Sequence, residues 1–228
     1  MQAKDVMTSP VITVAMDAAV TEIAELLLSR RISGVPVVDG EGKVVGIVSE
    51  GDLLRRVESG TNRPRARWLE VLVDRSEQAV EFLKTHGRRA QDVMSRPVVS
   101  VAPDTDLADI AELMEQRRIK RVPVLVDGRP VGMVSRANLL HGLVAYRHAP
   151  AGFDAQGDAA IRGALLEMLT SERWIDLDQL NIVVTDGVVH LWGMVDSEEQ
   201  RRALCTIASE IHGVKRVEDH LHRNLFVS

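Results

Sequence analysis

The chain has 228 residues, 45% of them apolar and 27% charged, a composition typical of a soluble globular protein with one large or two small domains. The formal net charge of −5 disfavours a protein that binds nucleic acid through bulk positive charge. The single cysteine, Cys205, excludes an internal disulfide framework, and no apolar run approaches the ~18 residues of a membrane span. No signal peptide is indicated either, so we expect a cytoplasmic protein that binds no nucleic acid.

An internal repeat occupies the first two thirds of the chain. Asp5-Val6-Met7 returns 87 residues later as Asp92-Val93-Met94, and Val35-Pro36-Val37 returns at the same offset as Val122-Pro123-Val124. The offset then falls to 86, which places the deletion of one residue in the intervening turn, where a duplicated segment tolerates it. The pattern indicates that one folding unit is present twice.

Each copy predicts the element order βαββα. In the first copy we expect a short strand near residues 11–14, and a helix whose apolar positions follow the i, i+3, i+4, i+7 spacing from Val20. A hairpin that turns at residues 39–42 follows, and then a closing helix from Gly51. Because two helices cover only part of a three-stranded sheet, we expect the copies to pack on each other about a pseudo-twofold axis.

Residues 59–90 separate the copies and predict a linker with an inserted helix that ends at Gly87. Five arginines lie between residues 55 and 67, and they suit either a solvated face or an anionic partner. After a second linker the pattern changes to αββαβ, with a hairpin about Asp186-Gly187 and a helix from Ser197 that stops at Gly213.

The VPV strands, together with the segments GIVSEGDLL and GMVSRANLL, resemble a tandem pair of cystathionine-β-synthase (CBS) domains, also called a Bateman module. The segments VVTDGVVHLWGMV and HGVKRVEDHL resemble a BON domain. The implied fold class is α/β (α+β), with two βαββα CBS repeats and a small αββαβ BON domain. The expected divisions are CBS domain 1 at 1–58, the linker with its helix at 59–90, CBS domain 2 at 91–146, a linker at 147–155 and the BON domain at 156–228.

The resemblance implies an adenosine-type ligand in two clefts between the copies, such as AMP, ADP, ATP, NAD(H) or S-adenosylmethionine. In the first copy, Ser49 and Asp52 lie where a strand ends and a helix begins. A carboxylate accepts two hydrogen bonds, which suits the vicinal hydroxyls of ribose, while a hydroxyl at a helix start suits phosphate. The same pair is also a helix-capping arrangement that needs no ligand, and both roles can hold together.

The second copy has Ser135 and Asn138 at these positions, and an amide offers one acceptor oxygen where a carboxylate offers two. Lys120 and Arg121 precede its VPV strand, at positions that face ligand phosphate in the resemblance. A solvated surface charge is the alternative for both cations. The corresponding residues of the first copy are Ser33 and Gly34.

The resemblance also implies that each cleft uses the first-strand segment of the opposite copy. These segments are Thr13-Val14 and Ser100-Val101, where an apolar side chain and backbone groups would contact adenine. Simple strand packing is the alternative, and it fits the two valines better than Thr13 and Ser100.

No common catalytic or nucleotide-binding motif is present, and the domains leave little of the chain for a catalytic unit, so we expect no enzyme activity and no required cofactor. Cys205 occupies an apolar helical position, and the histidines at 190, 220 and 222 lack the further ligands of a metal site. The sequence thus favours a homodimeric sensor whose BON domain contacts a phospholipid or a protein partner. The alternative is a structural adaptor with a ligand-free CBS platform.

Overall fold

The computed structural model describes residues 1–54, 86–147 and 154–223, so the predicted inserted helix and the arginine-rich segment lie outside the described residues. The chain forms two compact units. Unit 1 contains residues 1–11, 100–126 and 131–228, and unit 2 contains residues 12–99 and 127–130. The opening segment of each repeat therefore belongs to the unit built mainly by the other repeat.

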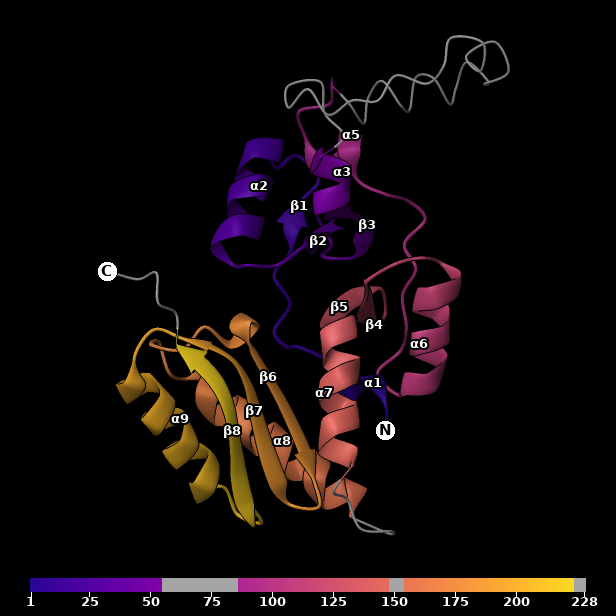
Figure 1. Cartoon of the computed structure of the whole chain (residues 1–228). Coiled ribbons are helices and arrows are strands. Elements are labelled where there is room, and N and C mark those ends of the chain that lie inside the picture. Colours follow the sequence, from indigo (N-terminus) through magenta and orange to yellow (C-terminus); the bar gives the residue numbers. More distant parts are fainter. Residues whose placement is uncertain (55–85, 148–153, 224–228) are drawn as a thin grey trace. The chain divides into compact units, whose positions relative to one another are not determined.

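Unit 2 contains the first CBS repeat. Its elements are β1 (Val14–Ala15), α2 (Val20–Ser29), β2 (Gly34–Val38), β3 (Val44–Ser49), α3 (Glu50–Leu54) and α5 (Ala90–Val93) (Figure 1). β2 pairs with β1 in parallel and with β3 in antiparallel orientation. The predicted helix buries Val20, Ile23 and Leu27, which confirms the spacing seen in the sequence, whereas the first strand is limited to two residues.

Unit 1 contains the second repeat, with the same order of helices and strands. Its elements are α1 (Ala3–Val6), α6 (Leu107–Gln116), β4 (Arg121–Val126), β5 (Arg129–Ser135) and α7 (Arg136–Tyr146). In place of a full first strand, Val101 forms a parallel bridge with Val124. The helix α1 comes from the start of the chain and contacts α7.

The BON domain completes unit 1 and has the predicted αββαβ order. Its elements are α8 (Ala155–Thr170), β6 (Leu180–Thr185), β7 (Val188–Val195), α9 (Glu198–Glu210) and β8 (Arg216–Arg223) (Figure 1). β7 is the central strand, antiparallel to β6 and parallel to β8. The hairpin turns at Asp186 (φ 52°) and Gly187 (φ 71°), the left-handed pair that a two-residue turn requires.

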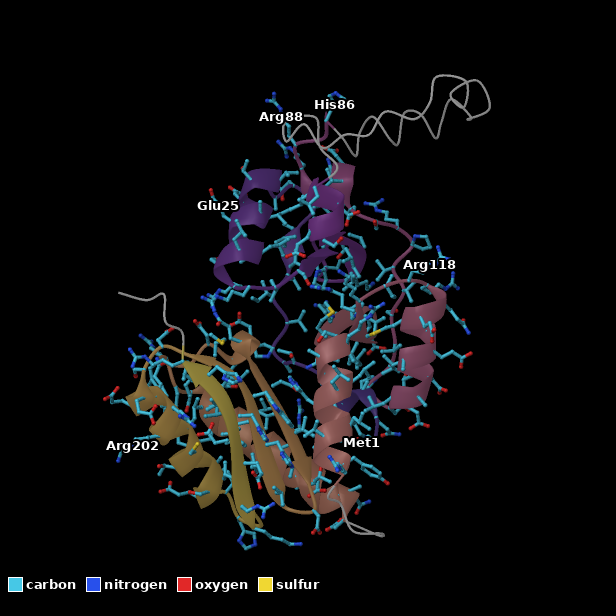
Figure 2. All side chains as sticks on the ribbon, viewed as in Figure 1. Met1, Glu25, His86, Arg88, Arg118 and Arg202 are labelled. Atoms are coloured by element: carbon cyan, nitrogen blue, oxygen red, sulfur yellow. The ribbon has the colours of Figure 1, made fainter. Side chains whose placement is uncertain are left out.

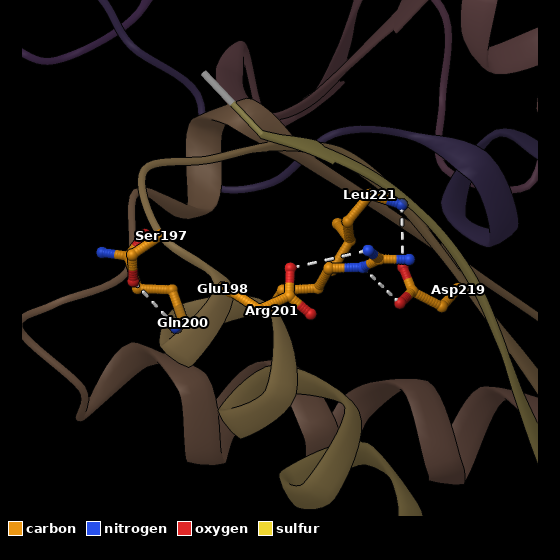
Figure 3. Close-up of polar contacts among 6 residues, drawn as sticks. All are labelled: Ser197, Glu198, Gln200, Arg201, Asp219 and Leu221. Atoms are coloured by element: carbon orange, nitrogen blue, oxygen red, sulfur yellow. Dashed lines mark hydrogen bonds and ion pairs between the residues drawn. The ribbon is translucent and has the colours of Figure 1, made fainter. Parts of the chain in front are cut away.

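Polar contacts fix α9 to β8 on one side of this sheet (Figure 3). The Nε of Arg201 donates to Oδ2 of Asp219 at 2.7 Å, and Oδ1 of the same carboxylate accepts from the Leu221 amide at 2.9 Å. Ser197 caps α9 by accepting from the Gln200 amide at 3.1 Å, as the sequence predicts. Further along α9, the charged side chain of Arg202 points away from the ribbon (Figure 2).

A methionine lies over a glycine at the same place in each repeat. A Cβ added at Gly46 would lie 2.7 Å from Met94 Cγ, and one added at Gly132 would lie 2.6 Å from Met7 Cγ. Met94 is only 4% exposed, so it has little room to move away. These two glycines let the methionine of the other repeat's opening segment pack directly on a strand.

We expect Gly46→Ala to lower the free energy of unfolding by about 1–3 kcal/mol, the usual cost of overpacking a core. Urea unfolding followed by circular dichroism measures this loss. Gly40→Ala is the matched control, because a Cβ at Gly40 meets no atom within 4 Å. Equal stability of the Gly46→Ala and Gly40→Ala variants would contradict the proposed packing role of Gly46.

Candidate ligand-binding turns and the BON interface

The first candidate turn joins β3 to α3. Asp52 Oδ2 accepts from the Ser49 amide at 2.9 Å and from the Ser49 hydroxyl at 2.6 Å. Its Oδ1 accepts from the Ser95 hydroxyl at 2.9 Å. An ionised carboxylate has about four acceptor positions, so three internal bonds leave roughly one for another donor. Asp52 thus orders the turn and keeps acceptor capacity on a half-buried side chain.

The second candidate turn joins β5 to α7 and repeats this geometry with an amide. Asn138 Oδ1 accepts from the Ser135 amide at 2.8 Å and from its hydroxyl at 2.6 Å. Asn138 Nδ2 donates to the Thr8 hydroxyl at 3.3 Å. Because a carbonyl oxygen has two lone pairs, Asn138 Oδ1 is saturated, and the side chain is only 4% exposed. The two turns are therefore alike in structure and unequal as acceptors.

Ser95 and Thr8 are the site residues that the sequence analysis missed. Each comes from the opening segment of one repeat and bonds to the turn of the other repeat. A signal was available, since each hydroxyl residue directly follows an Asp-Val-Met sequence and the two lie 87 residues apart. This signal can be interpreted only with the structure, which places the opening segment of each repeat in the unit of the other repeat.

The residues before each VPV strand lie beside these turns. The carbonyl of Ser33 accepts from the Glu50 amide at 3.1 Å, and Gly34 pairs with Ser49 across the strands. In the second repeat, the Lys120 carbonyl accepts from the Arg136 amide at 3.1 Å. The structure therefore places Lys120 directly before β4 and Arg121 at its first residue, next to the Ser135 turn.

The first-strand segments lie further along the sheets. Val14 pairs with Val37, three residues from Gly34, which corresponds to about 10 Å along β2. Val101 pairs with Val124 in the same way. Thr13 and Ser100, which precede these valines, are thus beside the middle of each VPV strand, and each stays with its own repeat.

The BON sheet carries rings on the face opposite its apolar core. The indole of Trp192 stacks with the imidazoles of His141 at 4.4 Å and His220 at 4.7 Å between ring centroids. His190 Nδ1 lies 3.4 Å from His220 Nε2, but the described residues contain no group of three or more potential metal ligands.

Burial raises the pKa of Cys205 to about 11, so its thiol is protonated at neutral pH.

His141 makes the contact between α7 and the BON sheet titratable. Its Nδ1 lies 2.8 Å from Asn181 Oδ1. Asn181 Nδ2 donates to the Val6 carbonyl at 2.6 Å, which orients the amide, so the His141 Nδ1 must carry the proton. Burial lowers the pKa of His141; the hydrogen bond to Asn181 opposes this shift, and the electrostatic interaction with His220 adds to it.

We expect acid to weaken this contact. A lowered pKa in the folded state means that the neutral imidazole stabilises the fold fully above about pH 6.5, and that this stability is lost as the pH falls. Hydrogen exchange of β6 amides between pH 7.5 and 5.5, corrected for intrinsic rates, measures the effect. His141→Phe keeps a ring on Trp192 and should abolish the increase in β6 exchange that wild type shows at pH 5.5. The same pH dependence in the variant and in wild type would exclude His141 as its source.

Among the described residues, none of the helices has the length and apolar character needed to span a membrane.

Residues 3–59 and 90–145 match the CBS domain family, and residues 157–224 match the BON domain family. The uncharacterized protein MJ1426 of Methanocaldococcus jannaschii is 33% identical over 153 residues, which cover 62% of this chain and 90% of that protein.

CBSX1, a chloroplastic CBS domain-containing protein of Arabidopsis thaliana, is 32% identical over 136 residues. That match covers 57% of this chain and 58% of CBSX1, so the chain spans little more than half of the plant protein. A crystal structure of CBSX2 in complex with AMP is similar with a TM-score of 0.55 and 27% identity, over 63% of this chain and 96% of that one. The chain belongs to the CBS domain family, and a BON domain follows its CBS pair.

Proposed function

We propose that this protein is a non-catalytic regulator whose CBS pair binds an adenosyl ligand and whose BON domain passes that state to a partner. The Ser49–Asp52 turn carries the proposal, because its carboxylate keeps an acceptor position beyond its three internal bonds. AMP is the first candidate ligand, since a structure similar to this chain is a complex with AMP. ADP, ATP, NAD(H) and S-adenosylmethionine share the adenosyl group and remain in the proposal.

Isothermal titration calorimetry with each of these compounds tests the proposal on the full chain. We expect saturable binding of at least one compound. Adenosine serves as the comparison and should bind more weakly than the phosphorylated compounds, because their phosphate groups would gain charge-assisted bonds. Absence of heat and of thermal stabilisation at millimolar concentration of every compound would reject the sensor. The adaptor with an unoccupied CBS platform would then replace it.

The second turn supports the adaptor as the second candidate function. Both lone pairs of Asn138 Oδ1 are used inside the protein, so a ribose hydroxyl would have to displace Ser135. One ligand bound per chain would indicate a sensor that uses only the first turn. The absence of any bound ligand would indicate the adaptor, in which the BON domain acts on a phospholipid or a protein without control by the CBS pair.

Lys120 provides a test for phosphate contact at the second repeat. For AMP bound at the second repeat, we expect Lys120→Ala to weaken binding by about 3- to 10-fold, consistent with the loss of one partly exposed charge-assisted bond, and to leave adenosine binding unchanged. Calorimetry at low and high salt measures both. Equal losses for AMP and adenosine would place Lys120 away from phosphate.

We also propose that the CBS pair forms a homodimer through its exposed helices. A groove of about 990 Å³ runs between α6 and α7, and Leu140 and Leu143 beside it are 62% and 67% exposed. Contiguous apolar surface of this kind is typical of a protein contact. Sedimentation equilibrium of the full chain decides it: a monomer at micromolar concentration would exclude the dimer, and Leu143→Glu should dissociate it.

A further inference from the structure

Within unit 1 the BON domain packs on the second CBS repeat through β6, which contacts both α1 and α7. The first residues of the chain lie in this contact. Asn181 of β6 donates from Nδ2 to the Val6 carbonyl at 2.6 Å. Arg162 of α8 donates from Nη2 to the Met7 carbonyl at 2.7 Å. Two BON side chains thus bind two successive backbone carbonyls.

Arg162 is well suited to detect a movement of this backbone. It is 9% exposed, and its Nε donates to the Ile182 carbonyl at 2.9 Å, so one guanidinium joins β6 to the start of the chain. Burial lowers the pKa of Arg162 to about 10, with a small opposite effect from Asp5, so the group remains charged at neutral pH. A buried cation depends on its acceptors, since losing one of them leaves charge uncompensated.

The next residue, Thr8, contacts the second candidate turn, Ser135–Asn138. Its hydroxyl accepts from Asn138 Nδ2 at 3.3 Å, and its backbone pairs with Met133 through bonds of 2.9 and 3.0 Å. Residues 6, 7 and 8 therefore carry, in succession, a bond to β6, a bond to α8 and a bond to the Ser135–Asn138 turn. Because these contacts lie on three successive residues, a shift of the backbone at Thr8 also moves the Val6 and Met7 carbonyls beside it.

We propose that residues 6–8 form a connector that couples the Ser135–Asn138 turn to the docking of the BON domain. A change in the orientation of Asn138 weakens the Thr8 contact, shifts the Val6 and Met7 carbonyls, and loosens Asn181 and Arg162 from them. The His141–Trp192 stack, which belongs to the same contact, reports the change. A ligand would turn Asn138 by binding at the second turn in place of Ser135, so this ligand step rests on the proposed function, whereas the coupling itself does not.

The first repeat offers an internal control. Ser95 makes the equivalent hydroxyl contact with Asp52, but it belongs to unit 2 and the BON domain belongs to unit 1. Thr8→Val and Ser95→Ala both delete one hydroxyl that contacts a turn. Only the first should affect the BON domain, if the connector transmits the change.

The experiment is hydrogen exchange with mass spectrometry on the full chain without ligand. We expect Thr8→Val to raise exchange in peptides of β6 and the first half of α8 by about 3- to 10-fold, while Ser95→Ala leaves these peptides unchanged. Thr8→Ser retains the hydroxyl and should restore wild-type exchange, which separates the bond from a general loss of fold. Unchanged exchange in Thr8→Val, or an equal rise in Ser95→Ala, would overturn the coupling.

A second measurement adds AMP at saturating concentration and compares wild type with Thr8→Val. We expect AMP to alter exchange in β6 of wild type, and expect this effect to be lost in the variant when AMP is supplied at a concentration that saturates each protein. If neither AMP nor any other of the adenosyl compounds binds, the proposed function fails, while the ligand-free comparison still decides the coupling. If AMP binds and β6 is unaffected in wild type, the ligand does not act through the connector.

Discussion

Asp52→Asn is expected to weaken AMP binding at the first repeat by about 10- to 100-fold without unfolding the turn. The loss follows because hydrogen bonds to a charged acceptor contribute about 1.5–3 kcal/mol, and an amide has a single acceptor oxygen. The chain itself shows that asparagine can hold such a turn, since Asn138 accepts both Ser135 bonds in the second repeat. Calorimetry with AMP and thermal unfolding on the same samples separate affinity from stability.

Two further variants define this result. Asp52→Ala removes the acceptors for the Ser49 amide and hydroxyl as well, so it should lose both affinity and about 1 kcal/mol of stability, typical of a lost helix cap. The reverse change, Asn138→Asp, gives the second turn a carboxylate and should create or strengthen binding there. Wild-type AMP affinity in Asp52→Asn would show that the first turn does not anchor ribose.

Asp158→Ala is expected to lower the free energy of unfolding of the BON domain by about 2–4 kcal/mol. Asp158 is 6% exposed and accepts from the amides of Asp186 and Gly187, each at 2.7 Å. The truncation leaves two turn amides without acceptors, and a buried unsatisfied group costs about 1–3 kcal/mol. Urea unfolding followed by tryptophan fluorescence, with hydrogen exchange at the 186–187 turn, measures the loss.

Asp154 supplies the matched control, because it also accepts from two backbone amides and lies at the start of the same helix. Its carboxylate caps α8 from an exposed position, accepting from Gln156 and Gly157 at 3.1 and 3.0 Å. Water can replace those bonds, so Asp154→Ala should cost only about 1 kcal/mol. If the two variants were equally stable, burial of the Asp158 carboxylate would not be the source of its effect.

The elements follow closely from local patterns in the sequence. The amphipathic spacing from Val20 predicts the buried face of α2, and Asp186-Gly187 predicts the hairpin of the BON domain. Ser197 predicts the start of α9. These features depend on neighbours within a few residues, so periodicity and turn chemistry are enough to locate them. The first strand was less well placed because only two residues, Val14 and Ala15, pair as a strand.

The sites depend on contacts that local patterns cannot specify. Because both repeats carry nearly the same pattern, the sequence of residues 1–11 fits either copy, and only the packing of the folded chain places it with the second repeat. That placement brings Thr8 to Asn138 and, in the first repeat, Ser95 to Asp52. The structure defines internal bonds for Ser49, Asp52, Ser135 and Asn138, whereas ligand binding by these residues is a proposal.

The sequence by itself determined the duplicated βαββα unit and the αββαβ domain that follows it, because both follow from residue types and their spacing. It also determined that Asp52 offers two acceptor oxygens where Asn138 offers one. The tertiary structure decided which repeat each opening segment joins and how the BON domain docks on residues 6 and 7. The physical reason is that a carbonyl of the backbone is the same group at every residue. Only long-range packing determines which carbonyl a buried arginine or asparagine will meet.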